Sequence, residues 1–317
     1  MAILVGTDEA GYGPNFGPLV ISATRWRIPD RLLGQDLYDL LSGCIHRDPD
    51  DDRIAVADSK ALYKPGKGLA RLERGVLSSA RTVGLPVRDW RQAWRSLAPS
   101  SVADLKILPW YKTFERELPI DAEPQAIQQG GELLAACFQD TDISLQQIEA
   151  VAVFPDRFNQ LVEDLGTKGG ALSEQTLDLA KRLIADCDER QILVQCDKHG
   201  GRNRYGPMLQ QRFPDYLVEV VRESRGVSIY RWGPQEQRVE FRFVAKGESF
   251  LPAALASMMS KYLRELAMKA FNTFWQNHLP EIRPTAGYPV DANRFRRQIR
   301  PVQNRLGIAD QVLWRNR

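Results

Sequence analysis

The 317-residue sequence has few of the residues that hold small secreted domains or structural zinc sites together. It contains four cysteines and three histidines, and no two cysteines form a Cys-x-x-Cys pair. A disulfide framework and a structural zinc site are therefore not indicated. No apolar run approaches the roughly 20 residues of a membrane-spanning helix, and the first residues lack the basic region of a secretory signal. We expect a soluble protein of the reducing cytoplasm, with no membrane association.

A strong net charge of either sign is also missing, because the 43 Lys and Arg residues nearly balance the 40 Asp and Glu residues and leave a net charge of +3. The distribution is less even than the total, since eight arginines lie between residues 283 and 317. A basic segment of this kind fits a surface that binds a polyanion, but it also fits an ordinary solvated face. The 43% hydrophobic and 26% charged residues are typical of a globular protein.

The most informative stretch is residues 3–26, where two apolar runs flank adjacent acids. The spacing predicts buried strands over 3–7 and 19–26, joined by a connection rich in glycine and proline. Asp8 and Glu9 lie where the first strand ends. Because consecutive strand residues face opposite ways, the two acids converge only if the strand ends or bulges there. Otherwise Glu9 could offer its main-chain carbonyl instead.

Two further acids follow the same pattern. Asp197 follows an apolar strand over 191–196, and Glu248 follows a strand over 239–245; each acid is adjacent to a glycine or followed closely by one. Buried carboxylates are costly unless a cation or a proton neutralises them, and oxygen-only clusters select Mg²⁺ or Mn²⁺ over zinc. Two such ions ~3.5–4 Å apart can hold both the attacking water and the leaving oxygen of a phosphodiester. For any one acid, capping a helix is the alternative.

Regular α/β alternation is expected along most of the chain. We predict helices over 30–42 with Asp30 as N-cap, 68–82, 124–138, 156–165, 173–188 with Ser173 as N-cap, and 251–274. Further strands are predicted over 150–154, 191–196, 217–221, 227–232 and 239–245.

Two features leave alternatives open. Trp90, Trp94, Trp110 and Tyr111 lie among basic residues, which suits base stacking, but two tryptophans four residues apart also suit the apolar face of one helix. His199 follows Asp197 closely and is either a general acid or phosphate ligand, or a surface residue of the loop.

The segment Asp8-Glu9-Ala-Gly11-Tyr12-Gly13-Pro14, with a later Gly17-Pro18, resembles the opening motif of ribonucleases HII and HIII, which cut RNA in RNA/DNA hybrids. Later elements resemble the same family in the same order. They are Asp58-Ser59-Lys60, Asp197, Lys246-Gly247-Glu248, the Ala256-Ser257 and Ser260-Lys261 pairs, and Thr285-Ala-Gly287-Tyr288-Pro289. The resemblance spans roughly residues 3–314, with poorly matched inserts at about 84–148 and 202–237.

This resemblance implies an α/β fold: a ribonuclease H-like mixed central sheet flanked by helices, with inserts and a helical C-terminal cap. The catalytic domain would span 1–275 and the arginine-rich helical segment 276–317. The implied activity is endonucleolytic hydrolysis of the RNA strand of RNA/DNA hybrids by a monomer with Mg²⁺ or Mn²⁺. The metal-binding catalytic acids would be Asp8, Glu9, Asp197 and Glu248, and the nucleic-acid-binding residues Gly11, Tyr12, Gly13, Ser59, Lys60 and Tyr288.

The sequence also departs from the family pattern. Tyr12 stands where type HII enzymes have Arg and type HIII enzymes have Thr, so selection of the cleavage junction can differ. Glu248 is closer to the HIII pattern. The pair Arg264-Glu265 stands where type HII enzymes often have Arg-Asp, which makes Glu265 a candidate to support the metal-binding acids, but an exposed helix position is the simpler interpretation. Two alternatives to the implied activity are a metal nuclease for DNA or branched nucleic acid on the same scaffold, and a catalytically silent protein that binds hybrids or RNA.

Overall fold

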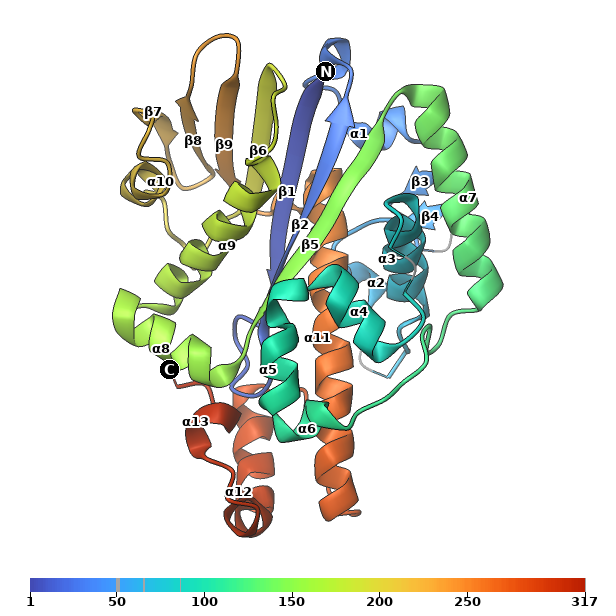
Figure 1. The fold of residues 1–317 in the computed structure, drawn as a ribbon, viewed down its shortest axis with the longest axis vertical. Helices are drawn as coiled ribbons and strands as arrows, with labels where there is room; N and C mark the ends of the chain where they lie inside the picture. Colours follow the sequence, from blue (N-terminus) through green and yellow to red (C-terminus); the bar gives the residue numbers. More distant parts are fainter. Residues whose placement is uncertain (50–51, 65, 86, 317) are drawn as a thin grey trace.

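The centre of the molecule is a seven-stranded mixed sheet in the order β5-β2-β1-β6-β9-β8-β7 (Figure 1). The computed structural model describes residues 1–49, 52–64, 66–85 and 87–316, and Glu248 by its backbone alone. The sheet strands are β1 (Ala2–Ala10), β2 (Leu19–Ile28), β5 (Ser144–Val153), β6 (Gln191–Asp197), β7 (Glu219–Glu223), β8 (Val227–Trp232) and β9 (Arg238–Val244). Helices flank this sheet, which confirms the expected α/β architecture.

The strands that pair with β1 on its two sides determine where the candidate site lies. β1 runs antiparallel to β2 without a register shift from Ala2–Ile28 to Ala10–Val20. It runs parallel to β6, and β6 runs parallel to β9. Because helices cover both faces of this part of the sheet, its strands read as continuous apolar runs. The predicted strands 3–7 and 19–26 are confirmed, and both extend further than the apolar runs alone.

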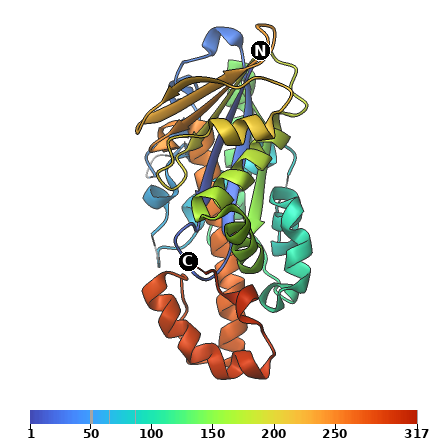
Figure 2. The same ribbon diagram turned by 90° about the vertical axis from the view of Figure 1, so that its left-hand side faces the viewer.

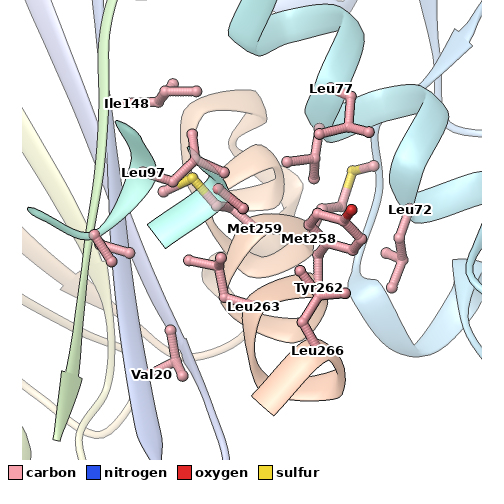
Figure 3. Close-up of a cluster of buried hydrophobic side chains, with 14 of the residues drawn as sticks. Val20, Leu72, Leu77, Leu97, Ile148, Met258, Met259, Tyr262, Leu263 and Leu266 are labelled. Atoms are coloured by element: carbon pink, nitrogen blue, oxygen red, sulfur yellow. The ribbon is translucent and has the colours of Figure 1, made fainter. Parts of the chain in front are cut away.

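One face of the sheet packs against the long helix α11 (Leu251–His278). Leucine, methionine and aromatic side chains at helical spacing line this helix, and almost all of them are buried. Figure 3 shows Met259 and Leu263 of α11 on the side of Val20 and Ile148 from the sheet, with Met258 on the side of Leu72. Leu72 belongs to α3 (Ala70–Thr82), so α11 lies between the sheet and a second helical layer.

The other face of the sheet is covered by α8 (Pro155–Leu165), α9 (Lys168–Ile184) and α10 (Gly206–Arg212). The predicted helix 173–188 was wrong at its start. The hydroxyl of Thr167 accepts from the Gly170 amide and caps α9, and the predicted cap Ser173 lies inside the helix. The two glycines after Lys168 continue the helix instead of forming a turn.

The first insert, about 84–148, is helical and largely buried. It contains α4 (Trp90–Leu97), α5 (Val102–Ile107), α6 (Pro109–Lys112) and α7 (Pro124–Thr141), and it ends in the first residues of β5. The rings of Trp90 and Trp94 lie 5.4 Å apart and are 2% and 1% exposed. Base stacking by these tryptophans is therefore wrong, and packing of one apolar helix face is correct.

The second insert adds α10, β7 and β8 to the sheet edge. Lys198 holds this insert, because its Nζ donates to the Ser224 carbonyl at 2.7 Å and to Asn203 Oδ1 at 2.9 Å. The lysine after Asp197 therefore has a structural role.

The predicted helix over 30–42 was wrong. Gly34 adopts φ +91° and separates a 3₁₀ turn, η1 (Asp30–Leu32), from the short helix α1 (Leu37–Leu40). Asp30 is not an N-cap; its carboxylate accepts from the Met1 amino group at 2.9 Å. The chain continues through β3 (Ile45–His46), β4 (Ile54–Ala55) and α2 (Ser59–Leu62). Asp50 and Asp51 of the acidic run 48–52 lie outside the described residues.

The final helices are α12 (Pro289–Arg305) and α13 (Asp310–Leu313), which lie at the foot of the molecule beside the end of α11 (Figure 2). Their buried residues Phe295, Ile299 and Leu313 belong to the same apolar cluster as α11. The expected boundary at 275 falls in the last turn of α11, and a separate segment 276–317 stays a prediction. Among helices in the described ranges, none has the length and apolar character required to cross a bilayer.

Candidate functional site

The candidate site lies where β1 and β6 end side by side. Thr7 pairs with Cys196, so the next residues, Asp8 and Asp197, occupy neighbouring positions on two parallel strands. Parallel strands bring their carboxyl ends to one edge of a sheet, which is why two acids 189 positions apart in the sequence meet.

Both aspartates face α11. A Cβ built on Gly6 would lie 2.1 Å from the Ala253 amide nitrogen, so the even-numbered face of β1 contacts the helix backbone. On β6, Gln195 lies on the same face, where its side chain donates to the Gly247 carbonyl at 3.5 Å. Asp8 and Asp197 continue these two faces by the two-residue period of a strand. The structure therefore places both carboxylates on one side of the sheet.

The first turns of α11 hold the end of β1. Ser260 Oγ donates to the main-chain oxygen of Asp8 at 3.0 Å and contacts Ser22 Oγ at 2.8 Å. Asp8 itself is buried, with 9% of its surface exposed. Helix and hairpin are thus fixed relative to each other at the position of the acid.

A short 3₁₀ turn, η3 (Gly247–Ser249), lies beside Asp197. The Gly247 amide donates to Asp197 Oδ1 at 3.2 Å, and Lys246 before it has a left-handed backbone with φ +63°. This turn carries the backbone of Glu248 next to Asp197. The side chain of Glu248 lies outside the described part of the chain.

Glu9 faces the other side of the sheet. β1 continues in regular pairing to Ala10, so the strand neither ends nor bulges between the two acids. Burial raises the pKa of the Tyr12 phenol, and the nearby Glu9 carboxylate raises it further. Burial likewise raises the pKa of Cys196 to about 12, with Asp197 and Glu9 adding to the effect. Glu9 therefore lies near Tyr12 and Cys196, on the face opposite Asp8. Of the two groups that Glu9 could offer to a site shared with Asp8, only its main-chain carbonyl is still compatible with this arrangement.

The donor set on the α11 side consists of oxygen. Asp8 and Asp197 supply carboxylates, which fit Mg²⁺ or Mn²⁺ and not zinc. Among the side chains that the structure describes, no group of three or more His, Cys, Asp or Glu residues is arranged to hold a metal ion.

His199 is a buried core residue, so both of its expected roles were wrong. Its Nδ1 lies 2.9 Å from Ser173 Oγ, and its ring packs against Phe243 with centroids 5.7 Å apart. Burial, assisted by the Arg202 charge, lowers the pKa of the imidazole to about 3. A neutral, enclosed imidazole is neither a general acid nor an exposed loop residue.

The glycine loop, which we define as residues 11–18, runs from Asp8 and Glu9 toward α12. Gly11 and Gly17 adopt φ +90° and +78°, conformations that only glycine reaches without strain. Gly13 faces Tyr288, since a Cβ built on Gly13 would lie 3.8 Å from Tyr288 Cε1. Tyr288 is 57% exposed. The predicted nucleic-acid-binding residues Gly13 and Tyr288 therefore meet at the surface.

Tyr12 turns away from this pair. A Cβ on Gly200 would lie 2.7 Å from the Tyr12 hydroxyl oxygen, and one on Gly169 would lie 3.8 Å from it. Tyr12 thus occupies a gap between the start of α9 and the turn after Asp197, and the absence of a side chain at Gly200 leaves room for its hydroxyl.

The Asp58-Ser59-Lys60 element sits against the middle of α11. Asp58 Oδ1 accepts from the Lys60 amide at 3.0 Å and caps α2. Ser59 is buried and its hydroxyl accepts from the Ser257 hydroxyl at 3.2 Å, whereas the Lys60 side chain is 85% exposed. Ser59 is therefore placed as a packing residue, and Lys60 is placed at the surface.

Glu265 is half-buried, so its interpretation as an exposed helix residue was wrong. It accepts from the Tyr63 hydroxyl at 2.9 Å and from Lys261, whose ammonium lies 4.3 Å from the Tyr63 ring centroid. No local sequence pattern marks this cluster, because its members come from α11 and from the segment after α2.

The preceding residue, Arg264, also escaped the sequence interpretation. It is 3% exposed and donates to the carbonyls of Phe16 and Pro18 in the glycine loop and of Ala286 before Tyr288. A buried arginine on an apolar helix face was the available signal, since arginine is almost never buried without partners.

No family model matches this sequence, and no curated protein matches it either. The solved structures that it is similar to are ribonucleases HII and HIII. The PCNA:RNase HII complex from Archaeoglobus fulgidus gives 15% identity and a TM-score of 0.43, covering 99% of this chain and 94% of that chain. The ribonuclease H2 from Pyrococcus horikoshii OT3 gives 13% identity and a TM-score of 0.44, covering 98% of this chain and 92% of that chain. Bst-RNase HIII in complex with Mn²⁺ gives 13% identity and a TM-score of 0.39, covering 99% of this chain and 66% of that chain.

Proposed function

We propose that this protein is a divalent-metal-dependent endonuclease that hydrolyses the RNA strand of RNA/DNA hybrids. The observation that supports it most is the position of Asp8 and Asp197, side by side on the α11 face with the turn η3 against Asp197. Two carboxylates from different strand ends, close to a third acid on an adjacent turn, form an acidic edge suited to hard cations.

In this proposal Asp8 and Asp197 hold Mg²⁺ or Mn²⁺, and Glu248 completes the set from η3. Bound there, the ions would activate water and stabilise the charge that develops on the scissile phosphate. The chain itself fixes the acids, because Ser260 anchors the main chain of Asp8 and the Gly247 amide orients Asp197. Glu9 contributes through its main-chain oxygen or supports the site from the opposite face.

Recognition of RNA is proposed for the glycine loop and its neighbours. The amides at Gly11 and Gly13 would meet a ribose 2′-hydroxyl, the group that distinguishes RNA from DNA. Tyr288, exposed beside Gly13, would pack on a sugar, and the exposed Lys60 would contact the backbone.

A second candidate is a metal nuclease for DNA or branched nucleic acid on the same scaffold. Its support is Tyr12, which packs against Gly200 and Gly169 and is thereby withdrawn from the surface formed by Gly13 and Tyr288. In this position the Tyr12 side chain would not help to select the cleavage junction, as an exposed Arg or Thr at the same position would.

The test is cleavage of three labelled duplexes, each with Mg²⁺, with Mn²⁺ and with chelator. The duplexes are a continuous RNA/DNA hybrid, a DNA duplex containing one ribonucleotide, and a plain DNA duplex. We expect metal-dependent cutting of the RNA strand only. Equal cutting of plain DNA would favour the second candidate, and binding without any cutting would favour a silent binding protein.

Replacing Asp197 tests the site itself. Asp197→Asn should reduce the cleavage rate at least about a hundredfold, because a neutral amide holds a divalent ion poorly. Salt-sensitive binding of the hybrid should persist. Asp215→Asn, which removes an exposed aspartate from the loop before β7, is the matched control and should cut at the wild-type rate.

A further inference from the structure

Two buried arginines lie beneath the glycine loop. Arg264 comes from α11, and Arg315 comes from the segment after α13; they are 3% and 1% exposed. Both guanidinium groups donate to main-chain carbonyls of the same loop. In the described part of the chain neither forms an ion pair with a carboxylate.

Arg315 holds the half of the loop that adjoins the acids. Its Nη2 donates to the Gly11 carbonyl at 2.6 Å and to the Pro14 carbonyl, and its guanidinium lies 4.5 Å from the Phe158 ring centroid. The main chain is paired as well: Arg315 N donates to Asn15 O, and Asn15 Nδ2 donates to Arg315 O, each at 2.9 Å.

The segment around Arg315 is itself anchored to α8. Asn159 Nδ2 donates to the Trp314 carbonyl at 2.9 Å, and the Asn316 amide donates to Asn159 Oδ1 at 2.7 Å. The Trp314 ring lies edge-on to Phe16 with centroids 5.1 Å apart. The loop therefore depends on residues some 300 positions away in the sequence.

The direction of the loop carbonyls has a consequence for its amides. In a trans peptide the C=O and the following N–H point in opposite directions. Because Arg315 binds the Gly11 carbonyl from the interior, the Tyr12 amide points away from Arg315. This amide donates to no acceptor among the described residues.

The positive charges of the two arginines would also favour a nucleic-acid backbone at the loop. Burial, and then the nearby charge of Arg264, lower the pKa of the Arg315 guanidinium, so the two cations lie close to each other beneath the loop. On Arg315, Nε and Nη1 have no hydrogen-bond partner in the described part of the chain. A ribose 2′-hydroxyl against the outer side of the loop could accept from the Tyr12 amide, and the phosphate beside it would meet the two buried positive charges behind the loop.

We propose that Arg315 is a positioning residue that turns the glycine loop into a surface for the sugar–phosphate backbone of an RNA strand. This inference rests on the proposed function of the site. Arg315 touches no substrate; it acts through the Gly11 and Pro14 carbonyls, and it gives the loop preference for a hybrid over a DNA duplex.

The experiment measures the dissociation constants of a fluorescent RNA/DNA hybrid and a matched DNA duplex by anisotropy, in chelator so that no cleavage occurs. Arg315→Gln should weaken hybrid binding about tenfold and binding of the DNA duplex less than threefold. Arg315→Lys keeps the charge but reaches one carbonyl instead of two, so its loss should be intermediate. Arg305→Gln, which removes an exposed arginine from α12, is the control and should match the wild type.

Asn159→Ala is the second variant, because it frees the Trp314–Asn316 segment without removing a buried charge. Should Arg315→Gln fail to fold by circular dichroism, an Asn159→Ala protein with at least a threefold lower hybrid preference would support the proposal. Unchanged preference in Asn159→Ala, despite faster hydrogen exchange at 314–316, would overturn it, as would equal losses for both duplexes in a folded Arg315→Gln protein. A wild type that prefers hybrids but cuts none would refute the nuclease and leave this inference standing.

Discussion

A single buried side chain can hold a whole loop in place, and Glu73 of α3 is the clearest case in this protein. Its buried carboxylate accepts from the amides of Ile120, Asp121 and Ala122, at distances between 2.6 and 2.8 Å. Three amide donors on one carboxylate form the kind of charge-assisted arrangement that stabilises a buried anion. Glu73 thus fixes the loop before α7.

Glu73→Gln should lower the free energy of unfolding by about 2–4 kcal/mol, because an amide NH₂ then faces backbone N–H groups that it cannot satisfy. Urea unfolding followed by circular dichroism measures the change. The control is Glu132→Gln on the exposed side of α7, which should stay within about 0.5 kcal/mol of the wild type. An equally stable Glu73→Gln protein would contradict the role given to this carboxylate.

Gly200 and Gly201 form a matched pair for testing where Tyr12 lies. Both have positive φ, +56° and +79°, but only a Cβ on Gly200 meets the Tyr12 hydroxyl; nothing lies within 4 Å of a Cβ on Gly201. Gly200→Ala should therefore be about 1 kcal/mol less stable than Gly201→Ala in thermal unfolding. Adding Tyr12→Phe should restore most of that difference, and no restoration would mean that the clash lies elsewhere.

At the scale of elements, the junction between α12 and α13 is held by Asp310. Gln303, Arg300 and Arg296 donate to its carboxylate at 2.7, 2.6 and 3.0 Å. The hydrogen bond from Gln303 is the largest cause that lowers the pKa of Asp310 to about 2, followed by the two arginines. The arginine-rich segment is thus partly occupied in structural pairing instead of being free for a polyanion.

A lowered carboxyl pKa stabilises the fold above the unfolded value near 3.9, and this stabilisation disappears as the pH falls toward 2. Asp310→Asn should therefore melt at a lower temperature than the wild type at pH 6, with the difference shrinking between pH 4 and pH 2. Scanning calorimetry across that range measures it. A difference that is constant with pH would show that the hydrogen bonds, and not the charge, hold the junction.

Elements with strong local patterns were predictable, and those set by distant contacts were not. Continuous apolar runs predicted β1, β2 and β6, alternating ones predicted β8 and β9, and a long apolar face predicted α11. The helix over 30–42 failed because Gly34 takes a left-handed backbone that no periodicity reveals. Asp8 and Asp197 were predictable as strand-end acids, whereas Arg264 and Arg315 bind carbonyls far away in the sequence, a contact that leaves no local pattern.

At the scale of the whole molecule, the contact of α11 with β1 connects the core to the acids. Gly6 allows the helix backbone to approach the strand, and the same helix anchors Asp8 two residues later through Ser260. Two layers that approach this closely cannot shift independently.

Gly6→Ala should lower the free energy of unfolding by at least about 3 kcal/mol, because its Cβ would meet helix backbone that cannot rotate away. Denaturant unfolding measures the loss. Gly226→Ala in the turn before β8, where nothing lies within 4 Å of an added Cβ, is the control for glycine replacement. A mild effect at Gly6 would mean that α11 moves freely against the sheet.

The regular pairing of β1 with both neighbours also decides which acid is available for chemistry. If β1 slid by one residue, Asp8 would turn into the apolar layer under α9 and Glu9 would take its place facing α11. The sheet would keep its hydrogen bonds, yet the carboxylate opposite Asp197 would be longer by one methylene. Under the proposed function, strand alignment would therefore itself determine which acid reaches the metal ions, an effect that amino-acid replacement at the acids alone would not detect.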